Sequence, residues 1–212
     1  MMLELIHPIW NEWNSRYSEP HRHYHRASHV FDMFNTATKE GILLNSNEVL
    51  AIWLHDIVYN IEVCDASNEA LSAEYAVKYI NDNLPLFRRL GVSAEIVETI
   101  IMDTRDHNVS YSLPHITSRN VIDLDLRILS EFSKGVYEAY VSLIADEFVP
   151  TYGIDAFVQG RAEWIDTMLS RDSIYVSKNT PLHMERNARR NLRREYEAMN
   201  DPEKYRTEYI QP

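Results

Sequence analysis

The stretch SNEVLAIWLHDIVY, residues 46–59, is apolar at nearly every position after its polar start. Ser46 is the expected helix cap, and Glu48 follows within the first turn, where an acidic residue is favourable. A helix that is apolar all round is buried. An unpaired carboxylate in such a place costs several kcal/mol, so Asp56 needs a cation, a metal ion or strong donors beside it. From this stretch alone, a buried ion pair and a metal ligand stay equally open.

Apolar periodicity, punctuated by proline and glycine, predicts helices along the rest of the chain and no alternating strand. The expected helices cover residues 8–17, 20–39, 46–59, 67–80, 93–103, 119–131, 134–148, 155–169 and 181–199. Only 5 of the 212 residues are glycine, which disfavours folds with many tight turns. No repeat or Ser/Gly-rich linker marks a boundary. We therefore expect an all-α, single-domain helical bundle over residues 1–212, with 181–212 as a closing helix and tail.

The formal net charge of −11 excludes a general affinity for nucleic acid polymers or anionic membrane surfaces, and it requires a local cation wherever a phosphate binds. The single cysteine, Cys64, cannot form an internal disulfide. Residues 1–10 lack the pattern of a secretory signal, and no apolar run is long enough to span a membrane. We expect a cytoplasmic protein without a membrane partner, and leave open whether it forms a homo-oligomer.

A second informative segment is RHYHRASHVFDMF, residues 22–34. On the expected helix His25 and His29 are four residues apart, so both imidazoles project from one face beside the core stripe. Imidazoles in such a place can bind a metal ion. Arg22 and Arg26 lie beside them and would supply the cations that a phosphate needs in this acidic chain.

The third segment is NVIDLDLRILS, residues 120–130, in which two aspartates interrupt an apolar helix. Two positions correspond to about 200° around the helix axis, so Asp123 and Asp125 cannot face the same site. Asp123 has Arg127 four residues later and is explained by a local ion pair. Asp125 has no basic residue three or four positions away and is the better candidate for a ligand.

The three segments together contribute His29, His55, Asp56 and Asp125. Two imidazoles and two carboxylates suit a divalent first-row metal with positions left open for water. The sequence does not choose among Mn, Fe, Co, Ni, Zn and Mg. It contains no GxGxxG, Walker loop, HExxH or GxSxG motif, which argues against the cofactors and reactions those motifs serve.

These motifs resemble the HD superfamily of metal-dependent phosphohydrolases, named for the adjacent pair seen here as His55-Asp56, and in particular a small bacterial branch of predicted hydrolases. The matching pattern runs Tyr17-x-x-Pro20-x-Arg22-x-Tyr24-His25-x-x-x-His29, Trp53-Leu54-His55-Asp56-Ile57-Val58-Tyr59, Asn68-Glu69-x-x-Ser72-Ala73, Thr104-x-x-His107, Asp123-Leu124-Asp125-Leu126 and Glu185-x-x-Ala188-Arg189-x-Asn191-Leu192. It covers nearly the whole chain. The resemblance implies an HD-type helical domain and a metal site formed by His29, His55, Asp56 and Asp125.

The reaction that the resemblance implies is hydrolysis of a nucleotide or another small phosphate ester by metal-activated water, with Asp56 also counted as catalytic. Some nucleotide-cleaving members carry Glu-Asp shortly after the His-Asp pair, where this chain has Tyr59-Asn60. The acid or base of those members therefore does not carry over. Glu69 is the substitute for proton transfer, although an exposed carboxylate at a helix start explains it equally well.

His107 is a further candidate that could reach the metal, hold a phosphate or only cap a helix. Arg22, His25 and Arg26 are the expected substrate-binding residues. Two other functions stay open: a metal- and nucleotide-binding sensor without turnover, and an HD-type di-iron oxygenase that would recruit His25 and His107 as extra ligands.

Overall fold

The computed structural model describes residues 10–62, 66–109, 118–178 and 180–210; Pro8 and Cys64 lie outside these ranges. The described residues form helices and contain no strand, which confirms the all-α prediction. None of the helices in these ranges combines the length and the apolar character that crossing a membrane requires. The chain divides into two units, Met1–Leu124 and Asp125–Pro212. The expectation of one continuous domain stays a prediction.

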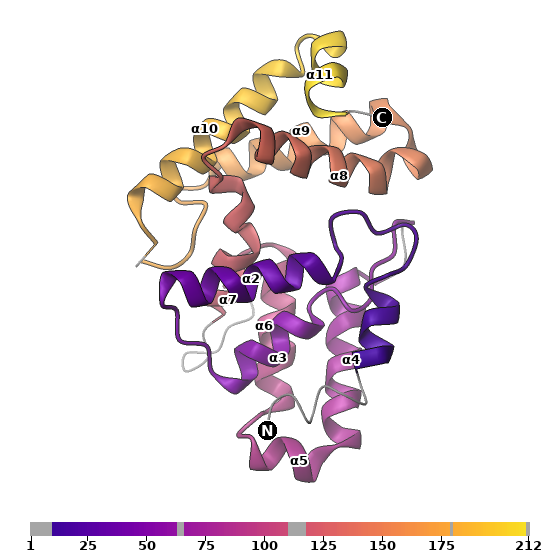
Figure 1. Ribbon diagram of the computed structural model, residues 1–212, viewed down its shortest axis with the longest axis vertical. Helices are drawn as coiled ribbons and strands as arrows, with labels where there is room; N and C mark the ends of the chain where they lie inside the picture. Colours follow the sequence, from indigo (N-terminus) through magenta and orange to yellow (C-terminus); the bar gives the residue numbers. More distant parts are fainter. Residues whose placement is uncertain (1–9, 63–65, 110–117, 179, 211–212) are drawn as a thin grey trace. The chain divides into compact units, whose positions relative to one another are not determined.

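The first unit is built around three helices, with α4 packed along α6 and α6 packed against α3 (Figure 1). Its core contains fully buried aliphatic side chains from all of these elements, such as Leu54, Ile80 and Ile101. After a helical stretch at residues 10–16, its helices are α2 (Ala27–Glu40), α3 (Ser46–Leu54), α4 (Asn68–Asp82), α5 (Leu84–Arg89), α6 (Ala94–Arg105) and α7 (Arg119–Asp125).

Two helix starts in this unit allow the predicted cap residues to be compared with the observed ones. Ser67 caps α4 as expected, because its side chain accepts a hydrogen bond from the backbone N–H of Ala70. The cap of α3 is Asn45, so the prediction of Ser46 was wrong by one residue. The Asn45 side chain accepts from the N–H groups of Asn47 and Glu48, and the Glu48 carboxylate accepts from the N–H of Asn45, which completes a capping box.

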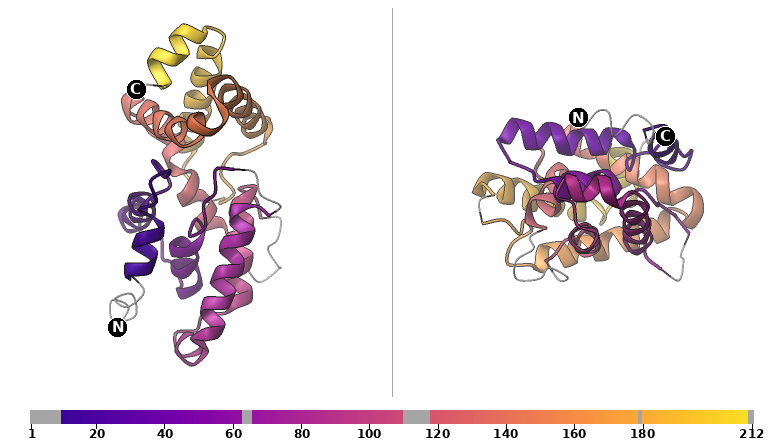
Figure 2. Two further views of the ribbon diagram at one scale, coloured as in Figure 1. Left: turned by 90° about the vertical axis from the view of Figure 1, so that its right-hand side faces the viewer. Right: turned by 90° about the horizontal axis from the view of Figure 1, so that it is seen from below.

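The second unit contains η1 (Leu126–Ser130), α8 (Lys134–Tyr152), α9 (Ile154–Ser170), α10 (Leu182–Ala198) and α11 (Pro202–Tyr209). Helix α9 packs against both α8 and α10 (Figures 1 and 2). Two predictions are corrected here. The expected helix at 119–131 is α7 followed by a 3₁₀ turn that begins at Leu126. The expected tail after 199 contains another helix, because Pro202 occupies its first turn, where a missing N–H costs nothing. Pro85 likewise occupies the first turn of α5, a helix that was not predicted from the sequence.

The second unit has a charged pair at its centre. Arg161 donates to both carboxylate oxygens of Glu195, at 2.9 and 3.1 Å. Tyr137 and Tyr205 also donate their hydroxyls to that carboxylate. Burial, and then the nearby Glu195 carboxylate, raise the pKa of Tyr137 and of Tyr205 far above the usual value. Both tyrosines are therefore neutral donors at any physiological pH.

Candidate metal centre

The first component of the site is the C-terminal end of α3. The sequence predicted that His55 and Asp56 lie inside this helix, but α3 ends at Leu54, His55 is its C-cap and Asp56 follows in a turn. The Nδ1 atom of His55 lies 2.9 Å from the carbonyl oxygen of Ile52. Because a carbonyl only accepts, Nδ1 carries the proton in this contact, and in the neutral ring the lone pair belongs to Nε2. A backbone carbonyl in this place is a common way of orienting a metal-binding histidine.

The second component is the start of α2. The predicted helix at 20–39 begins seven residues late, at Ala27, so the inference that His25 and His29 share one helical face is wrong. His29 lies in the first turn of α2, and His25 lies just before Arg26, whose backbone is extended. The two imidazoles are nevertheless neighbours, with ring centroids 6.0 Å apart. Tertiary contacts of residues 17–26, described below, override the helical tendency of this segment.

Asp56 lies against both metal-site histidines. Its Oδ2 atom is 3.0 Å from Nε2 of His55 and 4.0 Å from Nε2 of His29. The rings of His29 and His55 have centroids 5.4 Å apart and are steeply inclined to one another. All three side chains are buried, with His29 4% and His55 2% exposed. The two imidazole nitrogens and the carboxylate thus converge in a region largely removed from bulk water.

The third component is the C-terminal end of α7. Asp125 is the last residue of this helix, whose preceding residues all belong to the first unit. One ligand atom each from His29, His55 and Asp125 lie within 4.8 Å of one another, so this group can hold a metal ion. Asp125 is half-buried, whereas Asp123 is 7% exposed and does not belong to the group. The structure therefore places together the aspartate that the helical-face argument selected and the two histidines.

The chemistry of the donors fits a divalent metal ion. Two neutral imidazoles with carboxylate oxygens are a ligand set that binds Mn, Fe, Co, Ni or Zn ions, and it does not by itself distinguish among them. A cation bound here would offset part of the desolvation cost that burial places on the Asp56 carboxylate. These donors come from three separate elements of the chain: the start of α2, the C-terminal end of α3 and the C-terminal end of α7.

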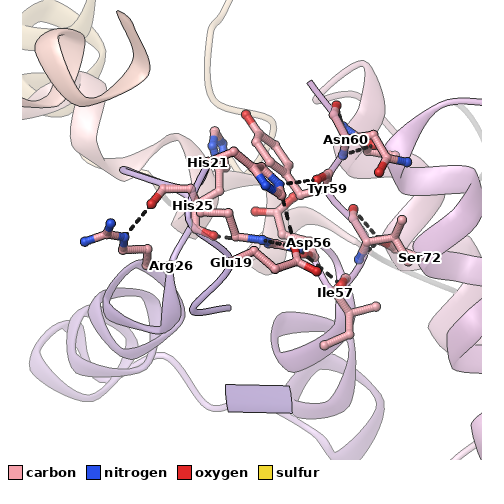
Figure 3. A network of polar contacts seen from close by, with 12 residues as sticks. Glu19, His21, His25, Arg26, Asp56, Ile57, Tyr59, Asn60 and Ser72 are labelled. Atoms are coloured by element: carbon pink, nitrogen blue, oxygen red, sulfur yellow. Dashed lines mark hydrogen bonds and ion pairs between the residues drawn. The ribbon is translucent and has the colours of Figure 1, made fainter. Parts of the chain in front are cut away.

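The structure gives Arg22 partners that differ from the expected phosphate. Its side chain is completely buried. The guanidinium donates to the carbonyl oxygens of His25 at 3.1 Å, Asp56 at 2.6 Å and Ile57 at 3.2 Å, and its Nε donates to Glu19 at 3.0 Å. Figure 3 labels the four residues that accept these bonds: Glu19, His25, Asp56 and Ile57. A guanidinium occupied in this way is a part of the protein interior, so we revise its predicted role as a substrate ligand.

The other predicted substrate residues lie nearer the surface. Arg26 is exposed and is the N-cap residue of α2. The ring of His25 is half-buried and stacks on Tyr59 at a centroid distance of 4.3 Å (Figure 3). The ring of Tyr24 lies beside both histidines, with its centroid 5.1 Å from that of His25 and 4.9 Å from that of His29. Sequence reasoning assigned no role to either tyrosine, although both stand within the motifs that carry the metal ligands.

Glu69 stands in the first turn of α4, half-buried. Two side chains of the same helix attach this turn to the segment that follows Asp56. The Ser72 hydroxyl accepts from the N–H of Val58 at 3.1 Å and donates to its carbonyl at 3.2 Å, and the Asn68 side chain pairs with the backbone of Asn60. Figure 3 labels Ser72 and Asn60. The start of α4 is therefore fixed to the turn that carries the His-Asp pair. The role of Glu69 in proton transfer stays a prediction.

His107 follows the C-cap of α6 and is half-buried. Its φ of 46° is in the left-handed region, the backbone conformation with which many helices end. Its N–H donates to the carbonyl of Thr104 at 3.3 Å. This geometry matches the capping alternative for His107, and its part in the chemistry stays a prediction.

Comparisons of this chain with protein-family models, with curated proteins and with solved structures found no match. The resemblance to the HD superfamily therefore depends on the motifs of this sequence itself. The donor group at the ends of α2, α3 and α7 is the structural observation that bears on it.

Proposed function

We propose that this chain is a metal-dependent phosphohydrolase of the HD type that acts on a nucleotide or another small phosphate ester. The observation that carries the proposal is the convergence of His29, His55 and Asp125 within 4.8 Å, with Asp56 against both histidines. The reaction class comes from the family resemblance, which selects these same four residues as ligands.

In this proposal His29, His55, Asp56 and Asp125 hold the metal ion. A bound divalent ion lowers the pKa of water toward about 7 and so supplies a nucleophile at neutral pH. The protein holds the donors in place: the Ile52 carbonyl orients His55, and the first turn of α2 carries His29. A preorganised set of ligands avoids reorganisation when the substrate binds.

The substrate phosphate is recognised by the positive end of α2. Backbone N–H groups in the first turn of a helix lack partners within the helix, and the helix dipole favours an anion there. His29 stands in that turn, where its own N–H donates to the carbonyl of Arg26 at 3.0 Å, and the exposed Arg26 is the N-cap residue. Arg26 thus provides the local positive charge that a chain with net charge −11 needs for a phosphate, and it takes the place first assigned to Arg22, with His25 beside it.

Proton transfer to the leaving group is assigned to Glu69, with His107 as the second candidate. Glu69 is favoured because Ser72 and Asn68, on the same helix, attach the start of α4 to Val58 and Asn60, just after the His-Asp pair. A carboxylic acid near the site serves as a general acid when its proton can reach the departing oxygen.

The test is to purify the chain without chelator, measure its metal content, and screen phosphatase, phosphodiesterase and nucleotidase substrates with Mn²⁺, Co²⁺, Ni²⁺, Fe²⁺ and Mg²⁺. We expect bound metal and metal-dependent release of phosphate or a nucleotide product. His55→Ala should lose both. His183→Ala is the matched control, because His183 is exposed and stands on α10 in the second unit.

Each alternative outcome points to a different reading. Bound metal and tight nucleotide binding with no product across all metals select a sensor. Two equivalents of iron with oxygen-dependent turnover select an oxygenase. Protein that contains no metal and takes none up contradicts the proposal altogether.

A further inference from the structure

Arg22 is a completely buried arginine in an acidic protein, and its partners are mainly backbone oxygens. Its guanidinium donates to the carbonyls of His25, Asp56 and Ile57 and to the carboxylate of Glu19. It also lies over the rings of Tyr17 and Tyr59, at 5.1 and 5.3 Å from their centroids. The planar guanidinium with its five N–H donors is the one side chain that can serve several acceptors in a fixed plane.

The position of these acceptors explains why the chain tolerates a buried guanidinium there. The last carbonyls of a helix have no partner within it, and they carry a partial negative charge. α3 ends at Leu54, so the backbone that leaves it must find other donors. The segment before α2 supplies several of them: besides Arg22, the Tyr17 hydroxyl donates to Trp53 O at 2.9 Å, and Nε2 of His21 lies 2.8 Å from Tyr59 O.

Two of the ligand-bearing segments meet at this guanidinium. One is the turn after α3, which contains His55 and Asp56, and Arg22 bonds to the carbonyl of Asp56 itself. The other is the approach to α2, where Arg22 bonds to the carbonyl of His25, four residues before His29. One side chain therefore links the backbone that carries His29 to the backbone that carries the His-Asp pair.

We propose that Arg22 is a positioning residue of the metal centre, which sets the distance between His29 and the His55-Asp56 pair by bonding to the backbone of both segments. This inference rests on the metal site of the proposed function and is independent of its phosphohydrolase chemistry. Arg22 bonds to the main chain of both segments and acts through it. Groups that hold metal ligands in place typically change metal affinity by about 10- to 100-fold when they are removed.

The experiment is a titration of the full chain with Co²⁺, whose visible absorption reports the geometry of its ligands. Arg22→Ala should bind Co²⁺ about 10- to 100-fold more weakly than the parent and show an altered spectrum. Guanidinium added far below its denaturing range should restore both, because it can occupy the vacated space. Arg22→Lys keeps the charge without the planar set of donors, and we expect it to bind about tenfold more weakly.

The matched control is Arg16→Ala, which removes an arginine of the same unit that lies over Tyr75 at 4.9 Å. It should leave the Co²⁺ affinity and spectrum unchanged. An arginine that served stability alone would lower the midpoint of thermal unfolding without changing either readout in the folded protein. If folded Arg22→Ala binds Co²⁺ as the parent does, the inference is overturned. If Arg22→Ala does not fold, parent-like Co²⁺ binding by Arg22→Lys overturns it instead. Failure of the parent chain to bind Co²⁺ counts instead against the metal site of the proposed function.

Discussion

Replacing Glu195 with glutamine tests the charged centre of the second unit. The side chain of Glu195 is fully buried and accepts from Arg161, Tyr137 and Tyr205. Arg161 is 8% exposed, and it is packed over the ring of Trp164 at 4.5 Å. Glutamine keeps the volume of the side chain and removes its charge. The guanidinium of Arg161 then stays buried without its counter-ion.

The expected loss follows from that uncompensated charge. Removing one partner of a buried ion pair costs about 3–5 kcal/mol. Glutamine retains one carbonyl oxygen as an acceptor, so we expect the lower end of this range, about 3 kcal/mol, for Glu195→Gln. Glu195→Ala also removes the carboxylate oxygens that accept from the hydroxyls of Tyr137 and Tyr205. Its cost should therefore reach the upper end of the range, about 5 kcal/mol.

Urea unfolding followed by circular dichroism measures these changes. With an m value of about 1–3 kcal/mol per molar urea, a loss of 3 kcal/mol lowers the midpoint by about 1–3 M. The control is Arg206→Ala, which breaks an exposed contact with Asp155 at 3.9 Å and should not move the midpoint measurably. Equal midpoints for Glu195→Gln and Arg206→Ala would show that the buried pair does not stabilise this unit.

Three further predictions concern the first unit and its boundary. Asp125→Asn should weaken Co²⁺ binding, because it removes a charged donor of the metal group, whereas folded Asp123→Asn should bind as the parent does. Burial, joined for Tyr75 by its hydrogen bond to Glu12, raises the pKa of Tyr75 and Tyr79 to about 12. Since their unfolded pKa is about 10, the contribution of these two tyrosines to the free energy of unfolding should be fully present below pH 10 and be lost as the pH rises toward 12. Tyrosinate absorbance should accordingly appear at higher pH than for free tyrosine, and a titration at the free value would contradict this. Asn45→Ala removes the cap of α3 and should cost about 1 kcal/mol in urea unfolding, so an unchanged midpoint would argue against the capping box.

The helical fold could be predicted because it depends on patterns that the side chains carry themselves. The Ser67 cap and the apolar spacing after it locate α4 almost to the residue, since both act within a few positions of one another. Asp125 could be selected in the same local way. A residue with no basic neighbour on its own helical face must find its partner elsewhere, and the structure places it with His29 and His55.

The end of α3 and the late start of α2 could not be predicted, because both depend on backbone acceptors. Every residue has a carbonyl oxygen, so the sequence contains no sign that the oxygens of Asp56 and Ile57 are the ones that Arg22 serves. The same contacts hold residues 20–26 out of the helix that their spacing favoured. For this reason the sequence singled out Arg22 but gave no sign of the backbone carbonyls to which its side chain donates.

Because the Arg22 side chain is buried and bonded to the backbone, an anionic substrate would have to be bound by other positive groups of this chain. At a net charge of −11 the long-range field repels phosphate, and burial of the Arg22 side chain removes one of the cations that was expected to offset it. In the proposed site the remaining attraction comes from Arg26, the first turn of α2 and the metal ion. Of these a divalent ion would have the largest charge, and Asp56 and Asp125, which would hold it, are the carboxylates whose repulsion of phosphate it would offset. We infer that phosphate binding itself, and not only turnover, requires the metal. The measurement compares the binding of inorganic phosphate to chelator-treated and to metal-loaded protein. Equally tight binding by both would contradict this requirement for the metal.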